Sequence, residues 1–155
     1  NFAGLLHMVM HSLTKSAIFY AVGHISQIKG TQRISRIRGL TVTHPVLGWG
    51  LVTGVVAITG LPPLGIFMSE FLVVSSTFAR APLLAIVLVF GLLIAFGALT
   101  LRLTSIAFGK PRGSTAPVEA SYVPMFAHLS LVLIAGIYLP APLVVWFQHV
   151  ARLLG

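Results

Sequence analysis

The sequence predicts an all-α integral membrane protein with about four transmembrane helices. Of its 155 residues, 57% are hydrophobic and only 8% are charged. A soluble domain carries roughly 25% charged residues, because its surface must be wetted. Four apolar segments bounded by charges or turn residues each reach the roughly 20 residues that a helix needs to cross a bilayer. The lipid bilayer is therefore the expected solvent and partner of this chain.

The charge balance gives a formal net charge of +8, from ten lysines and arginines against two acids, Glu70 and Glu119. Basic loops beside apolar segments are typical of membrane topology signals, whereas nucleic-acid binding needs a clustered basic face. We therefore expect no nucleic-acid partner. The chain has no cysteine, which excludes disulfides and thiolate metal sites.

The first and third apolar segments, at about residues 2–25 and 82–108, fit single spans. The second, residues 45–78, would measure about 50 Å as one straight helix. It is interrupted by Gly60, Leu61, Pro62 and Pro63. Adjacent prolines remove two backbone donors, so we expect a broken helix here, with a simple proline kink as the alternative. A broken backbone at membrane depth must face protein or water, which points to a transport path.

The fourth apolar segment, at about residues 123–150, contains the sequence Leu-Pro-Ala-Pro at residues 139–142. We expect the span to end near Leu139 and an amphipathic tail to follow at the membrane interface. Four basic residues fill the loop at residues 26–44, Arg80 is alone in the second loop, and Lys110 and Arg112 lie in the third. By the positive-inside rule, the first and third loops are cytoplasmic and both termini lie outside.

Lys15 lies about midway along the first span, where an ionisable residue costs about 2.5–3.5 kcal/mol on insertion scales. His7, His11 and Lys15 are spaced i, i+4 and i+8, so they share one face of a helix. Histidine exchanges protons near neutral pH, and burial moves lysine toward that range. This row of three side chains on α-helical spacing predicts a series of groups that hold and pass protons. The alternative is that they only form hydrogen bonds between helices and have a structural role.

Glu70 is the only acid within a predicted span, seven residues after Pro63. A nearby cation favours the ionised carboxylate and burial favours the neutral one, so Glu70 is suited to titrate together with Lys15. An interfacial glutamate is the simpler alternative. The i, i+4 spacing of His7 and His11 can bind a metal ion, but no carboxylate lies nearby to complete the site. His128 on another span could pair with either histidine to bind a haem. We expect neither a metal nor another cofactor in this chain.

Three motifs in this order resemble the antiporter-like, proton-translocating membrane subunits of respiratory complex I and membrane-bound hydrogenases. Residues 6–16 read LHMVMHSLTKS, residues 60–71 read GLPPLGIFMSEF and residues 108–112 read FGKPR. The stretch at residues 11–39 is most similar to component F of hydrogenase-4, of the formate hydrogenlyase type. The resemblance covers most of the chain.

The resemblance implies that residues 1–155 are the C-terminal part, the last four helices, of a subunit of about fourteen. It also implies that His11 and Lys15 belong to a central axis of proton transfer, that His7 lies one turn away, and that Glu70 is the outlet residue. The expected partners are the rest of the parent chain, other membrane subunits, and a redox arm with iron–sulfur or nickel–iron centres.

The predicted function is therefore ion translocation, most simply of protons, by a multi-pass inner-membrane subunit of a redox-driven oxidoreductase complex of the hydrogenase-4 or NADH-quinone oxidoreductase type. The chain itself is expected to hold no catalytic centre. Two alternatives stay open. One is a stand-alone cation/proton antiporter subunit, and the other is a structural membrane-anchor subunit whose polar residues only fix helix packing.

Overall fold

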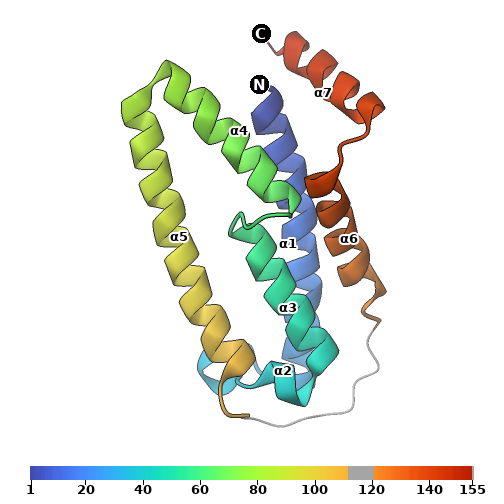
Figure 1. The fold of residues 1–155 in the computed structure, drawn as a ribbon. Helices are drawn as coiled ribbons and strands as arrows, with labels where there is room; N and C mark the ends of the chain where they lie inside the picture. Colours follow the sequence, from blue (N-terminus) through green and yellow to red (C-terminus); the bar gives the residue numbers. More distant parts are fainter. Residues whose placement is uncertain (112–120, 155) are drawn as a thin grey trace.

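The structure, a computed structural model, describes residues 1–111 and 121–154, and within these ranges it is all-helical (Figure 1). The elements in chain order are α1 (Phe2–Lys29), the 3-10 turn η1 (Ile34–Arg36), α2 (Leu40–Thr43), α3 (Pro45–Ile58), α4 (Gly65–Arg80), α5 (Pro82–Phe108), α6 (Val123–Ile137) and α7 (Ala141–Leu153). A proline occupies the first or second position of α3, α5, α6 and α7, where its missing N–H costs no hydrogen bond.

Helix α1 is the central element, because it packs against α3, α4, α6 and α7. Its 28 residues span about 42 Å at 1.5 Å per residue, which is more than the bilayer core requires. The buried face of α1 carries residues at helical spacing, namely Leu6, Met10, Thr14, Ala17, Ala21 and Ile25. The helix ends at Gly30, whose φ of 59° only glycine adopts without strain.

The second apolar segment forms two helices, α3 and α4, with Gly60, Leu61, Pro62 and Pro63 in the stretch between them. The remaining backbone donors of this stretch are satisfied within the protein. Gly60 N–H donates to the carbonyl of Ala57 at 3.1 Å, and Leu61 N–H donates to the carbonyl of Val56 at 3.4 Å. A break in a helix at membrane depth is tolerated only where protein or water satisfies its backbone polar groups.

Two glycines let the break pack closely against neighbouring helices. A Cβ built on Gly136 of α6 would overlap the Pro63 carbonyl oxygen and lie 2.7 Å from the backbone nitrogen of Gly65. A Cβ on Gly65 would lie 2.6 Å from the sulfur of Met10 on α1. Small residues at helix contacts are the usual means of close packing inside membranes. The break is therefore held between α1 and α6.

Judged by length and apolar composition alone, α5 is long and apolar enough to cross a membrane, with a mean hydropathy of 2.8 in its most apolar window. Helices α6 and α7 would make a second span if they count as one, although they meet at 85°. Helix α1 is long enough, but His7, His11 and Lys15 reduce its apolar character. The predicted count of four spans therefore goes beyond what length and composition establish for the described residues.

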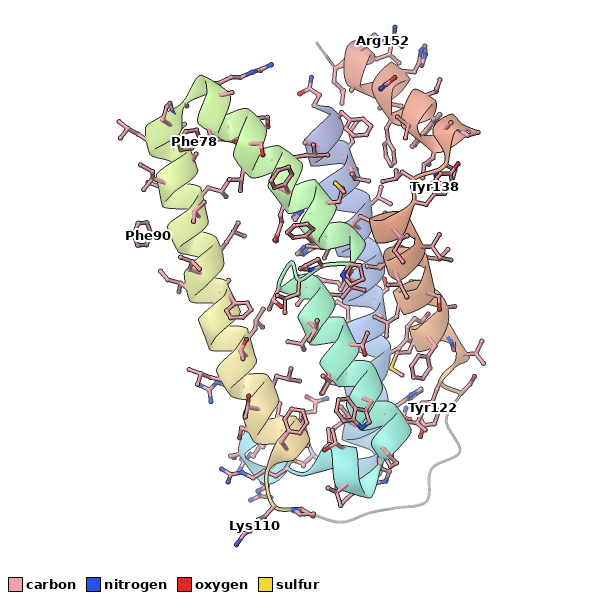
Figure 2. All side chains as sticks on the ribbon, in the orientation of Figure 1. Phe78, Phe90, Lys110, Tyr122, Tyr138 and Arg152 are labelled. Atoms are coloured by element: carbon pink, nitrogen blue, oxygen red, sulfur yellow. The ribbon has the colours of Figure 1, made fainter. Side chains whose placement is uncertain are left out.

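The two ends of the bundle differ in charge. The chain termini, the α4–α5 connection and Arg152 lie at one end, and α2, η1 and Lys110 lie at the other (Figures 1 and 2). The loops at residues 26–44 and around Lys110 therefore share one end, as the alternating basic loops predict. Burial, and then the charge of Lys29, lowers the pKa of His44 at this end, so His44 is neutral at pH 7. Arg112 and Glu119 lie outside the described residues.

Replacing Gly136 by alanine should destabilise the subunit, because the added methyl group meets backbone atoms of the break that cannot move aside. Overpacking of this kind costs about 1–3 kcal/mol. The measurement is thermal unfolding of the full-length subunit in detergent.

The matched control is Gly91→Ala on α5, because a Cβ at Gly91 meets nothing within 4 Å. Alanine favours helix over glycine by about 1 kcal/mol, so the control should be neutral or slightly stabilising. Equal melting temperatures for the Gly136 and Gly91 variants would contradict the close packing of the break.

Candidate functional site

The predicted row on α1 runs along the edge of its buried face. His7 and His11 are half-buried, and their ring centroids lie 5.5 Å apart. Lys15, one turn further, is exposed in the described structure. The helical spacing thus keeps the three side chains on one side of α1. The row begins where α1 packs against α4 and ends at Lys15, where α1 is not covered by other described residues.

The row meets α4 through His7. Its Nδ1 lies 3.1 Å from the hydroxyl oxygen of Ser69, which is fully buried. The Ser69 hydroxyl donates its single hydrogen to the carbonyl of Ile66 at 2.8 Å. The hydroxyl must then accept from Nδ1–H of His7, which leaves Nε2 of the neutral ring as a proton acceptor. Ser69 was not singled out from the sequence, because a serine on an apolar helix gives no signal of its partner.

Glu70 follows Ser69 on α4 and is half-buried. Its carboxylate lies against Gly60, so closely that a Cβ at Gly60 would overlap the Oε2 atom. Gly60 also has a φ of 69°, which favours glycine. The break and the acid are therefore one local structure, in which Gly60 provides both the turn and the space for the carboxylate.

The structure brings His7 of α1 into contact with Ser69 near the start of α4, and Glu70 is the next residue on that helix, with its carboxylate against Gly60. It does not bring Lys15 into a hydrogen bond or ion pair within the described ranges. An amine midway along α1 and exposed there needs a covering surface of protein or water if the helix crosses a bilayer. This surface is absent from residues 1–111 and 121–154.

The remaining histidines lie elsewhere. His128 on α6 packs on Tyr20, with ring centroids 5.7 Å apart, and its Nδ1 lies 2.7 Å from the Pro124 carbonyl oxygen. Tyr20 is thirteen residues beyond His7, about 20 Å along α1, so His128 and His7 do not face a common iron. Among the described residues, no three histidine, aspartate or glutamate side chains gather in a metal-binding group.

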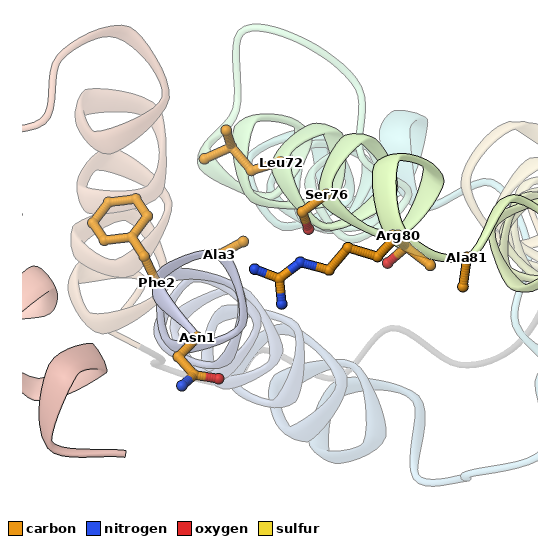
Figure 3. A pocket seen from close by; sticks show the side chains of 8 residues that line it. Asn1, Phe2, Ala3, Leu72, Ser76, Arg80 and Ala81 are labelled. Atoms are coloured by element: carbon orange, nitrogen blue, oxygen red, sulfur yellow. The ribbon is translucent and has the colours of Figure 1, made fainter. Parts of the chain in front are cut away.

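A cavity of about 460 Å³ lies between the start of α1 and the second half of α4, at the end of the bundle that carries the termini (Figure 3). Ser76, Thr77 and Arg80 line it from α4, and the Arg80 side chain extends toward Ala3 on α1. Thr77 is two turns beyond Glu70 on α4, about 10 Å along the helix. No sequence pattern predicted this cavity.

Comparison with known proteins identifies a family for this chain. A family model described as NADH:quinone oxidoreductase/Mrp antiporter, TM, matches residues 2–95, more than half of the chain. The matched range contains the whole row on α1, the break and Glu70.

Three curated relatives extend the comparison. A hydrogenase-4 component F homolog of Methylacidiphilum infernorum is 64% identical over 154 residues, which are 99% of this chain and 32% of the relative. Formate hydrogenlyase subunit 3 of Escherichia coli is 31% identical over 144 residues, 85% of this chain and 23% of the relative. A Na(+)/H(+) antiporter subunit of Alkalihalophilus pseudofirmus is 32% identical over 97 residues, 61% of this chain and 20% of the relative.

The chain thus spans about a third or less of the length of each of these relatives. Their names confirm the predicted resemblance to membrane subunits of the hydrogenase-4 and formate hydrogenlyase type. On the family match, which covers the row on α1, the break and the acid, the chain belongs to the transmembrane NADH:quinone oxidoreductase/Mrp antiporter family.

Proposed function

We propose that this chain carries part of the proton path of an ion-translocating subunit in a redox-driven membrane complex. The observation that carries the proposal is the contact of His7 with Ser69 at 3.1 Å, because it joins the titratable row on α1 to the helix that bears Glu70. In this path Lys15 holds the proton at the centre, His11 and His7 pass it along α1, and Glu70 releases it.

The exposure of Lys15 supports a path that is completed by the rest of the parent chain. The relatives are about three times as long as this chain or longer. Leu61, Pro62 and Pro63 of the break are exposed as well, and irregular backbone at membrane depth must face protein or water. Helices contributed by the remainder of the subunit would cover both features and hold water between them.

The cavity beside Arg80 is suited to be the outer end of this path. It lies further along α4 than Glu70, and Ser76 and Thr77 offer hydroxyls that keep water in place. The fixed positive charge of Arg80 lowers the proton affinity of groups beside it, which favours release of a proton into the water outside. The chain then needs no cofactor of its own, because the redox arm of the complex supplies the driving force.

The membrane arrangement that fits this role has four spans: α1, the broken pair α3 and α4, α5, and α6. Helix α7 then lies near the outer interface, with Trp146 exposed on it. The subunit then lies in the inner membrane of the cell. Its basic end, with Lys29 and Lys110, faces the cytoplasm, and both ends of the described chain lie outside.

The match to a Na(+)/H(+) antiporter subunit favours a second candidate, a stand-alone cation/proton antiporter subunit. The same residues then exchange protons against sodium without an electron-transfer partner. Inverted membrane vesicles distinguish the two: acidification that requires the electron donor of a co-purifying iron–sulfur or nickel–iron arm supports the redox-driven complex. Acidification driven by a sodium gradient alone supports the antiporter.

Lys15→Ala in the full-length subunit should lower proton translocation by about a hundredfold, the lower part of the range that a positioned proton-transfer group contributes. Lys15→Arg should not restore it, because arginine keeps its proton at physiological pH. The measurement is the rate of acidification in vesicles, with assembly of the complex checked by native electrophoresis. Wild-type rates in a fully assembled Lys15→Ala complex would leave helix packing as the better account.

Glu70→Gln should block release, because the amide has no proton to exchange at this position. Glu70→Asp should retain part of the rate, since the shorter carboxylate still lies near Gly60. Both variants are compared in the same vesicles, together with their melting temperatures, because a changed contact at Gly60 also affects stability. A Glu70→Gln complex that pumps as fast as Glu70→Asp would exclude the carboxylate from the path.

The orientation is tested by single cysteines at Ser35 and Ala79, which are both exposed and lie at opposite ends of the bundle. The described chain has no cysteine, so labelling is specific once any others in the parent are removed. A membrane-impermeant maleimide should label Ala79→Cys in intact spheroplasts and Ser35→Cys only after the membrane is opened. Labelling of both from the same side would overturn the topology.

A further inference from the structure

A polar stripe runs along α1 from beside Lys15 to the basic end of the bundle, on a different side of the helix from His7 and His11. Its members, at helical spacing, are Ser16, Tyr20, His24 and Gln27. The stripe covers about 16 Å along the helix axis, which is about half the thickness of the bilayer core. Polar side chains within a span are costly against lipid, so the stripe is expected to face protein or water.

Helix α6 adds two titratable side chains to the polar stripe, because it packs against α1 and runs in the opposite direction (Figure 1). The ring of Tyr122, just before α6, lies 5.7 Å from the ring of His24, measured between centroids. About 9 Å further along α6, the ring of His128 lies 5.7 Å from that of Tyr20. The four rings thus form two levels. Tyr122 marks the level near the basic end (Figure 2), and His128 marks the deeper one.

Each of the two histidines has a ring nitrogen that is available to exchange a proton. Nδ1 of His24 is buried and has no hydrogen-bond partner among the described residues. Buried polar atoms in folded proteins usually bind an internal water molecule when no protein group reaches them. Nδ1 of His128 lies 2.7 Å from the carbonyl oxygen of Pro124. A carbonyl only accepts, so Nδ1 of His128 carries the hydrogen, and Nε2 of the neutral ring is a proton acceptor.

An open hollow of about 310 Å³ joins the deeper level to the middle of α1. Ser16, Phe19 and Tyr20 line it. It has room for several water molecules, and the hydroxyls of Ser16 and Tyr20 can hold them. Lys15 precedes Ser16 and is exposed beside the hollow. Helices of the parent chain that cover Lys15 would also close the hollow toward lipid and keep water inside it.

We propose that the polar stripe and the two ring levels form the inlet of the proton path, through which protons from the cytoplasm reach Lys15. The inference rests on the proposed function, in which Lys15 is the central proton holder, and it adds the route by which Lys15 is loaded. An imidazole accepts a proton at one nitrogen and releases one from the other, and a phenol hydroxyl both accepts and donates. The inlet lies toward α6 and the outlet toward α4, and Lys15 lies where the two meet.

The test is the rate at which the assembled complex builds a membrane potential in inverted vesicles, whose cytoplasmic surface faces the medium. His24→Phe keeps an aromatic ring against Tyr122 but exchanges no protons, so the rate should fall by about a hundredfold. His24→Ala should be as slow, and imidazole added to the medium should restore most of its rate by occupying the vacated space. Imidazole should not restore His24→Phe, whose ring fills that space. The potential is measured because a permeant weak base dissipates a pH difference but not a potential.

His149→Phe is the matched control, because His149 is exposed on α7 at the opposite end of the bundle. It should retain the wild-type rate. His128→Phe is a second variant on α6, which should be slow with normal assembly and keeps the test valid if His24 variants do not assemble.

A wild-type rate in assembled His24→Phe or His128→Phe, or a His24→Ala complex that imidazole does not restore, would overturn the inlet. Lys15→Ala in the same vesicles separates this result from a failure of the proposed function. If Lys15→Ala is slow while His24→Phe is fast, the path through Lys15 stands and its inlet lies elsewhere. If both are fast, the inlet and the proposed function fail together.

Discussion

Gly136 has no side chain where the carbonyl of Pro63 approaches α6, and this close contact positions most of the candidate site. The break between α3 and α4 lies against α6 at this glycine, and Gly65 lets the same segment approach Met10 of α1. Helix α4 then begins beside α1, so Ser69 meets His7 and Glu70 is held over Gly60. The chemistry proposed for this chain thus depends on a packing contact between backbone atoms and glycines.

The polar groups also explain why α5 alone, among the described helices, is long and apolar enough to cross a membrane by itself. Helix α1 is long enough to span, yet its row of histidines and Lys15 makes it less apolar than α5. The second apolar segment is divided by its prolines into helices of 14 and 16 residues, each too short to cross alone. In a transporting subunit such interruptions are expected, because residues that move ions are those that lipid disfavours.

Sequence patterns predicted the boundaries of α5, the residues that interrupt the second segment, and the end of α6 near Leu139, because prolines and apolar runs act locally. They also predicted that His7, His11 and Lys15 share a face, which follows from helical periodicity alone. They did not predict the contact of His7 with Ser69, the position of the Glu70 carboxylate against Gly60, or the cavity beside Arg80. These depend on how helices distant in sequence pack together, which periodicity within one segment does not specify. The role of Lys15 depends in addition on helices outside this chain.

The central claim is that α1 and α4 form one path, and it is tested most directly by combining partial changes on the two helices. His7→Gln and Glu70→Asp should each slow proton translocation in the assembled complex without stopping it. If both residues serve one path, the double variant should translocate about as fast as the slower single variant, because steps in one sequence are not independent. Effects that multiply in the double variant would mean that the two helices act separately, and would contradict the account.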